Sequence, residues 1–251
     1  MTDLPPGWEW ARLDEVAEVR LGRQRSPKNH TGNQMRPYLR AANVGWDGLR
    51  LDDVKMMNFT DDEVKTYRLE YGDVVVSEAS GSPGEVGKPA LWRGEIEGCC
   101  LQNTLIRVRS LGAVEPAYLL HFLRTEALRG AFAERSRGVG IHHLGSGQLA
   151  EWIIPVPPLS EQRRVILTLE EHLSNIDLGL ATLRSAELGA ARLRSALLED
   201  AFSGGLLPQD PNDEPASVLL ERMKMERAAQ PRLRRARRTT KNADPEQESN
   251  L

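Results

Sequence analysis

The sequence has few of the features that mark secreted, membrane-bound or zinc-binding proteins. Its first residues, MTDLPPGWEW, contain neither a basic segment nor an apolar core, so they predict no signal peptide. No apolar run approaches the roughly 20 residues that a membrane-spanning helix needs. Cys99 and Cys100 are adjacent and are the only cysteines, which excludes a disulfide framework and a Cys/His zinc spacing. We therefore expect a cytoplasmic protein with no membrane partner and no metal site.

Signatures of catalysis are also missing. The stretch GSPGEVGKP (81–89) is close to a phosphate loop, but its glycine gap is one residue too long. Pro89 also stands where a Ser or Thr would bind magnesium. The stretch GVGIHHLGSG (138–147) lacks the third glycine of a dinucleotide fingerprint, and no Gly-x-Ser-x-Gly elbow is present. The chain is predicted to be a binding protein with no catalytic residues and no cofactor of its own.

Charge is distributed unevenly, although the formal net charge is only −3. Seven basic residues and one acidic residue lie between Arg20 and Arg50, whereas residues 51–73 hold seven acidic and three basic residues. A low net charge argues against a protein that coats nucleic acid nonspecifically. The uneven distribution indicates either a polarised binding surface or a solvated loop of mixed charge.

Residues 1–158 predict a domain of α+β class. Short runs rich in β-branched residues, separated by turn signals, predict strands at 38–44, 73–77 and 104–109. Helices are expected over 13–19 and over 116–132, where Pro116 suits a first helical turn. The whole chain is therefore expected to be a mixed α/β domain followed by a long helix and a short C-terminal helix.

Residues 159–203 predict one long helix. No proline occurs between Leu159 and Gly204, and Ser160 is a suitable N-cap. At about 1.5 Å per residue the helix would extend for about 60 Å, and its apolar rhythm matches a coiled-coil seam. The rhythm slips once near Ala186. The seam is expected to pair with a second long helix from another chain, although packing along its own domain is the alternative. The seam consists of Ile166, Leu169, Leu173, Ile176, Leu180, Leu183, Leu193 and Leu197.

Residues 204–251 predict a loop, an amphipathic helix over 216–229 and a disordered basic tail. The arginines and lysine of the tail would contact phosphates in one interpretation and stay solvated in the other.

The segment IPVPPLSEQRRVI (154–166) resembles the junction found in specificity (S) subunits of Type I restriction–modification systems. Three further stretches resemble other parts of this family, namely LPPGWEWARLDEVAEV (4–19), YGDVVVSEASGSPGEVGKPAL (71–91) and GIHHLGSGQLAEWIIPVPPL (140–159). The stretch LLPQDPNDEPASVLLERMKMER (206–227) resembles the end of many such subunits. These stretches occur in the family's order and are distributed between residues 4 and 227.

The resemblance implies a non-catalytic DNA reader. Residues 1–158 would be a target-recognition domain, residues 159–203 a spacer and dimerisation helix, and residues 204–251 the C-terminal part. In the family, the spacer sets the distance between two half-sites in double-stranded DNA. Partner methyltransferase subunits methylate adenine with S-adenosylmethionine, and a restriction subunit uses ATP and magnesium.

One recognition domain and one spacer helix are visible here, whereas most members of the family carry two of each. We therefore interpret the chain as a half-size S subunit. Two copies paired through antiparallel helices would read a palindromic bipartite target, whereas a different half-subunit as partner would give an asymmetric target.

Base reading needs hydrogen-bonding side chains in a groove, together with cations on phosphates. Two polar, turn-rich stretches offer this chemistry, residues 20–36 and residues 134–143. The predicted DNA-binding residues are Arg23, Arg25, Lys28, Asn29, His30, Arg36, Arg137, His142 and His143.

Two other classes of protein remain as alternatives. The first is a restriction or modification enzyme with an embedded recognition domain, which the missing Asn-Pro-Pro motif disfavours. The second is a coiled-coil adaptor with no role in DNA binding. Binding of S-adenosylmethionine would favour the first, and equal binding to all DNA sequences would favour the second.

Overall fold

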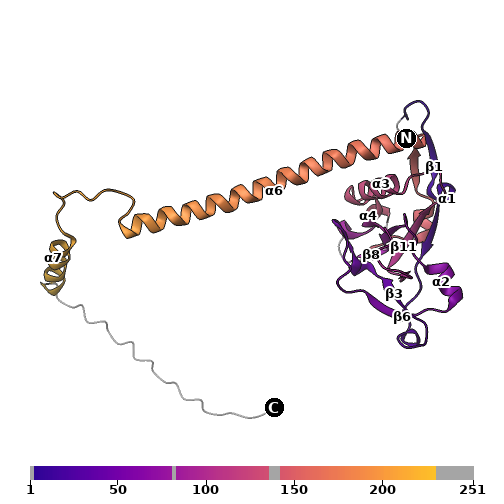
Figure 1. Ribbon diagram of the computed structural model, residues 1–251, viewed down its shortest axis with the longest axis horizontal. Helices are drawn as coiled ribbons and strands as arrows, with labels where there is room; N and C mark the ends of the chain where they lie inside the picture. The colour runs from indigo at the N-terminus through magenta and orange to yellow at the C-terminus, as the bar shows by residue number, and fades with distance from the viewer. Residues whose placement is uncertain (1–2, 81–82, 136–141, 230–251) are drawn as a thin grey trace, which may run out of the picture. The chain divides into compact units, whose positions relative to one another are not determined.

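A computed structural model describes residues 3–80, 83–135 and 142–229, and the predicted α+β class is confirmed (Figure 1). The chain divides into two compact units, residues 1–180 and 181–251. The helices are α1 (Leu13–Val16), α2 (Asp61–Tyr67), α3 (Pro116–Leu128), α4 (Ala131–Arg135), α5 (Ser146–Ala150), α6 (Leu159–Ser203) and α7 (Ala216–Ala229), with 3-10 turns η1 (Pro27–Asn29), η2 (Ala41–Asn43) and η3 (Pro83–Glu85). The strands are β1 (Glu9–Arg12), β2 (Ala17–Leu21), β3 (Met35–Leu39), β4 (Val44–Gly45), β5 (Gly48–Leu49), β6 (Lys55–Asn58), β7 (Val74–Ser77), β8 (Ala79–Ser80), β9 (Pro89–Leu91), β10 (Cys100–Leu101), β11 (Leu105–Ser110), β12 (His142–His143) and β13 (Ile153–Val156).

The centre of the first unit is an antiparallel sheet in the order β2-β11-β7-β9. Strand β7 contains three consecutive valines, Val74–Val76, and all three are fully buried. Because neighbouring side chains in a strand point to opposite faces, such a run requires a cover on both faces of the sheet. On one face Val74 and Val76 belong to the same apolar cluster as Leu119 of α3, and on the other Val75 belongs to a cluster with Trp92.

A smaller sheet in the order β10-β3-β6 lies beside the central one. Strand β10 runs parallel to β3, and β6 runs antiparallel to it. Met57 and Phe59 are fully buried with Cys100 in a third apolar cluster, against which Val64 and Tyr67 of α2 pack. The adjacent cysteines are therefore core residues. Burial raises the pKa of Cys99 to about 12 and that of Cys100 to about 11.

Several predicted elements of this unit are confirmed and others end early. Strands β7 and β11 lie where 73–77 and 104–109 were predicted. The strand predicted over 38–44 is wrong in its middle, because the chain turns through η2 before β4 begins. The helix predicted over 116–132 ends at Leu128, since Gly130 takes a φ of +74° before α4 starts. The helix expected over 13–19 ends at Val16, and Ala17 begins β2.

The second unit comprises the end of α6 together with α7. Every described residue from 181 to 229 is exposed, so neither helix buries its apolar side chains within this unit. Gly204 has a φ of +80°, and the amide of Gly205 donates to the carbonyl of Asp200 at 2.8 Å, which confirms the predicted glycine stop. The helices predicted over 159–203 and 216–229 have those bounds. Within the described ranges, no helix is both long enough and apolar enough to cross a membrane.

Candidate nucleic-acid interface

The first candidate loop, residues 22–34, joins β2 of the central sheet to β3 of the smaller sheet. Its start is anchored to the turn between β10 and β11. The amide of Arg23 donates to the carbonyl of Leu101 at 2.8 Å, and the amide of Asn103 donates to the carbonyl of Arg23 at 3.0 Å. A Cβ at Gly22 would lie 2.3 Å from the carbonyl oxygen of Gln102, so only glycine fits this close approach.

Arg23 is predicted to bind DNA, but the structure gives it partners inside the domain. Its guanidinium is paired with Glu63 at 2.6 Å and donates to the carbonyl of Asn58 at 2.6 Å. It also lies over the ring of Phe59, 4.9 Å from the ring centroid. With 12% of its side chain exposed, Arg23 holds the loop against α2, and its role in DNA binding remains a prediction.

The other basic residues of this region separate into two groups. Four of the seven basic residues between Arg20 and Arg50 are in ion pairs, which are Arg20–Glu18, Arg23–Glu63, Arg40–Asp53 and Arg50–Asp47. Arg25, Lys28 and Arg36 are exposed and form no ion pair with any residue in the described parts of the chain. Arg25 donates from Nε to Nε2 of His30 at 3.0 Å. Asn29, which precedes His30 in the sequence, is half-buried. The cations available to a ligand in this region are therefore Arg25 and Lys28 of the loop and Arg36 of β3.

The second candidate loop is described only at its end. Arg137 lies outside the described residues, and for His142 the structure describes the backbone pairing of β12 with β8. His143 is exposed, and its Nδ1 lies 3.2 Å from a carboxylate oxygen of Glu78. The amide of Glu78 donates to the carbonyl of Thr104 at 2.9 Å. The start of the first loop, through Arg23, and the end of the second, through Glu78, are therefore both held by the turn of residues 102–104.

The glycine-rich stretch 81–89 has a packing role where it is described, from Pro83 onward. Gly87 has a φ of +75°, and a Cβ there would lie 2.1 Å from Cδ2 of Phe132. Lys88 pairs with Glu85, and this hydrogen bond lowers the pKa of the Glu85 carboxyl. Trp46 donates to the same carboxylate at 3.0 Å. These contacts explain the glycine and the lysine without a bound phosphate.

The long helix α6 begins within the first unit. The structure begins α6 at Leu159, so the predicted N-cap at Ser160 is wrong, and the carbonyl of Pro158 accepts from the amides of Glu161 and Gln162 at 2.8 and 3.0 Å. The side chain of Gln162 is fully buried. Strand β13, which precedes the junction, pairs antiparallel with β1 in a register that opposes Glu9 to Val156.

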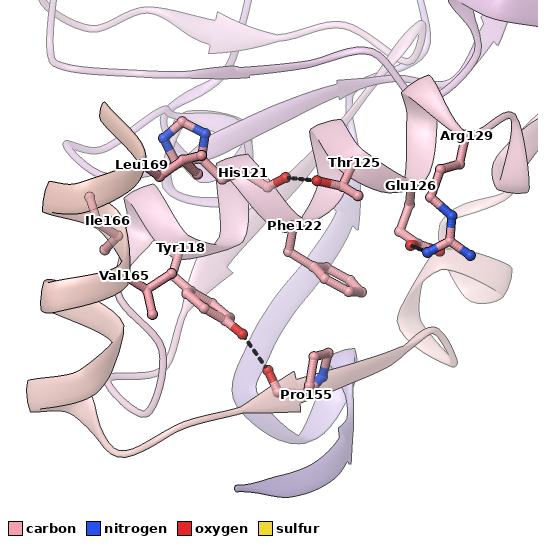
Figure 2. Close-up of a pocket in the computed structure, with 10 residues that line it drawn as sticks. All are labelled: Tyr118, His121, Phe122, Thr125, Glu126, Arg129, Pro155, Val165, Ile166 and Leu169. Atoms are coloured by element: carbon pink, nitrogen blue, oxygen red, sulfur yellow. Dashed lines mark hydrogen bonds and ion pairs between the residues drawn. The ribbon is translucent and has the colours of Figure 1, made fainter. Parts of the chain in front are cut away.

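Figure 2 shows the pocket formed by α3, β13 and the first turns of α6. The hydroxyl of Tyr118 donates to the carbonyl of Pro155 at 2.9 Å, while Val165 and Leu169 line the pocket from α6. Ile166 packs against the main core, and every residue of α6 beyond Leu169 is exposed. Burial lowers the pKa of His121, whose Nε2 lies 3.8 Å from Glu170 of α6. The predicted seam therefore begins inside the domain and continues as an exposed apolar stripe.

The family profile described as the Type I restriction modification DNA specificity domain matches residues 5–185. The chain belongs to this family. It is 27% identical over 207 residues to the Type I restriction enzyme StySPI specificity subunit of Salmonella potsdam, covering 81% of this chain and 44% of that protein. It is 24% identical over 227 residues to the EcoKI specificity subunit of Escherichia coli K12, covering 89% and 48%. The specificity-domain chain thus spans about half the length of these curated relatives.

Solved structures agree with this assignment. An HsdS subunit from Thermoanaerobacter tengcongensis matches with a TM-score of 0.55 and 27% identity, over 82% of this chain and 47% of that one. A chain from a study of complex assembly and conformational transition of the type I R-M system matches with a TM-score of 0.63 and 25% identity, over 82% and 48%. The resemblance inferred from the sequence is confirmed at the level of the family.

Two structural features of this specificity-domain chain were missed by reasoning from sequence. Asp73 follows the glycine of the YGD motif, and its buried carboxylate binds Arg109 through two hydrogen bonds of 2.7 and 2.8 Å. Gln162 was not singled out in the sequence, although it is the buried residue of α6 among those described. Gln162 lies among the polar residues Ser160, Glu161, Arg163 and Arg164, and sequence alone does not tell a buried amide from an exposed one.

Proposed function

We propose that the chain reads one half of a bipartite site in double-stranded DNA as part of a Type I specificity subunit. Membership of the specificity-domain family supports DNA recognition, and the loop 22–34 with β3 supplies the chemistry. Arg25, Lys28 and Arg36 present cations that no described acidic side chain neutralises, and this is the observation that carries the proposal. Such cations neutralise phosphates, or read guanine when an arginine enters the major groove.

In this proposal the chain binds DNA and sets the distance between half-sites, and its partner subunits carry out the reactions. Methyltransferase subunits would methylate adenine with S-adenosylmethionine, and a restriction subunit, where one accompanies them, would use ATP and magnesium. The exposed stripe of α6 supports pairing with a second long helix, because leucines such as Leu183, with 67% of its surface exposed, are placed in water at a coiled-coil spacing. A second copy of this chain is the proposed partner, and a different half-subunit is the alternative.

A genome-wide map of methyladenine, before and after deletion of the gene, tests this function. Loss of one palindromic bipartite motif is expected if two copies pair with two-fold symmetry. Loss of an asymmetric motif would mean that a different half completes the reader. An unchanged map, together with equal binding of the purified complex to all DNA sequences, would contradict the proposal and favour the adaptor.

The three cations without an ion pair are expected to contribute more to DNA affinity than the cations that are paired with carboxylates. A triple variant, Arg25→Ala with Lys28→Ala and Arg36→Ala, should bind the mapped duplex about 10-fold or more weakly in physiological salt. If all three residues contact phosphates, the slope of log K against log salt should fall in magnitude by about 2.7, since each contact contributes about 0.9. Titration of the complex with fluorescent duplex at several salt concentrations measures both quantities.

The matched control removes the same amount of charge from paired positions. Arg20→Ala with Arg40→Ala and Arg50→Ala also removes three positive charges, but each of these arginines faces a carboxylate in the domain. Equal losses of affinity in the two triple variants would contradict a specific role for the loop. If Arg25 reads a base, Arg25→Ala alone should relax one position of the motif, at a cost of about 1–3 kcal/mol.

A further inference from the structure

Gln162 uses its side-chain amide to join three parts of the recognition domain. Its Oε1 accepts from the amide of Glu115 at 2.8 Å, and its Nε2 donates to the carbonyls of Ala113 and Pro157 at 3.0 and 2.8 Å. The residue is 0% exposed, so no water competes for these bonds. Both N–H donors of the amide are satisfied, as a buried polar group requires.

The three partners belong to segments that determine where α6 begins. Glu115 is the N-cap of α3, Ala113 lies in the loop that leads to it, and Pro157 lies between β13 and α6. One side chain in the first turn of α6 therefore holds the end of β13 and the start of α3 in a fixed relation. The other contacts at this place are the apolar packing of Ile166, the Tyr118 bond to Pro155 seen in Figure 2, and an ion pair of 2.7 Å between Arg163 and Glu115.

A small change in the direction of a helix at its N-terminal end produces a large displacement of residues farther along it. Every residue of α6 from Glu170 onward is exposed, although Glu170 still lies 3.8 Å from His121 of α3. Among the described residues of α6, Gln162 is the one that is buried. A tilt of about 10° at the base would displace a point about 30 Å along the helix by about 5 Å, because each residue adds about 1.5 Å. That displacement exceeds the rise of about 3.4 Å per base pair.

We propose that Gln162 is a positioning residue, which fixes the direction of α6 on the recognition domain and so selects the number of base pairs between the two half-sites. The effect on spacing rests on the proposed function, whereas the effect on helix direction does not. Gln162 contacts no DNA in this proposal, and the bases read within each half-site are set elsewhere.

Two substitutions separate the hydrogen bonds from the shape of the side chain. Gln162→Met keeps a similar volume and removes all three bonds. Gln162→Glu keeps the shape but directs an acceptor at the carbonyls of Ala113 and Pro157, which have no hydrogen to donate. Arg163→Ala is the control, because it removes the exposed ion pair to Glu115 in the same turn.

The direction of the helix is measured first, without DNA. Spin labels at Asp62→Cys on α2 and Glu171→Cys on α6 occupy exposed positions within the first unit, in the full chain diluted with unlabelled protein. The native cysteines are buried thiols and should take up little label. The distance distribution should be at least about two-fold broader in Gln162→Met than in wild type or Arg163→Ala. An unchanged distribution would overturn the proposal whatever the chain does on DNA.

Spacing is measured next, from methyladenine maps of hosts that carry each variant with the methyltransferase subunits. Gln162→Met and Gln162→Glu should retain the bases of each half-site, with methylation at the native spacing reduced about 10-fold relative to sites one base pair longer or shorter. The proposal would be overturned if the spin-label distances broaden while the preferred spacing between half-sites stays unchanged. It would also be overturned if Arg163→Ala changed the spacing preference as much as the Gln162 variants do. Loss of the half-site bases as well would make Gln162 a folding residue. A wild-type chain that directs no methylation would contradict the proposed function instead.

Discussion

Replacing Asp73 by alanine is expected to lower the free energy of unfolding of the recognition domain by about 3–5 kcal/mol. The carboxylate is fully buried between β7 and β11. It accepts from Nε and Nη2 of Arg109 at 2.7 and 2.8 Å, and from the amide of Glu70 at 2.7 Å. These bonds raise the pKa of the Arg109 guanidinium, so alanine would leave a strong cation with Glu70 and a backbone carbonyl as its remaining partners.

Urea unfolding followed by tryptophan fluorescence measures this effect, because Trp92 and Trp152 are buried in the two main clusters of the domain. The control is Asp62→Ala on α2, which removes an ion pair of 2.8 Å from a side chain that is 92% exposed. Exposed pairs contribute about 1 kcal/mol or less, so this control should change stability little. A loss below about 1 kcal/mol in Asp73→Ala would contradict the structural role assigned to the YGD motif.

Secondary-structure elements that are determined by their own local sequence could be predicted. The helix from Leu159 to Ser203 follows from a proline-free stretch with an apolar repeat and glycines at its end. The buried strand β7 follows from its run of valines. At residues 41–43, by contrast, the chain departs from the predicted strand, since Asn43 uses its side chain to bind the amide of Arg40 and the carbonyl of Arg50. Local side-chain bonds of this kind compete with strand formation, and a pattern of strand propensity does not reveal them.

The partners of the residues predicted for the candidate site could not be read from the sequence. The basic segment 20–50 could be recognised by composition, yet its cations differ in partner, and the partners of Arg23 and Arg40 are remote in sequence. Arg23 meets Glu63 from 40 residues away, whereas Arg25, two positions later, is exposed beside His30. Which arginine holds the fold and which is available to DNA depends on how the two sheets are placed. Sequence reasoning had no access to that placement.

Placing charges at the centre of the seam is expected to abolish pairing of the long helices. For the variant Leu180→Glu with Leu183→Glu, we expect the dissociation constant for self-association to rise by about 100-fold or more. In a two-fold antiparallel pair the seam from Ile166 to Leu197 has its midpoint between these two leucines, so residue 180 of one copy lies opposite residue 183 of the other. Four carboxylates would then meet at an interface that excludes water, and burying unpaired charge is costly.

Sedimentation equilibrium of the full chain measures this change, with Leu167→Glu as the control. Leu167 is 68% exposed and Leu183 is 67% exposed, so the two sites are equally hydrated in one copy, but Leu167 lies outside the seam. The urea unfolding of the recognition domain should stay unchanged in both variants, because all three leucine side chains are exposed in the single chain. Dimers that persist in the double variant would contradict pairing through this seam. A wild-type chain that stays monomeric while its complex methylates DNA would show that a different half-subunit covers the leucines, since 45 residues of helix with an exposed apolar stripe still require a partner.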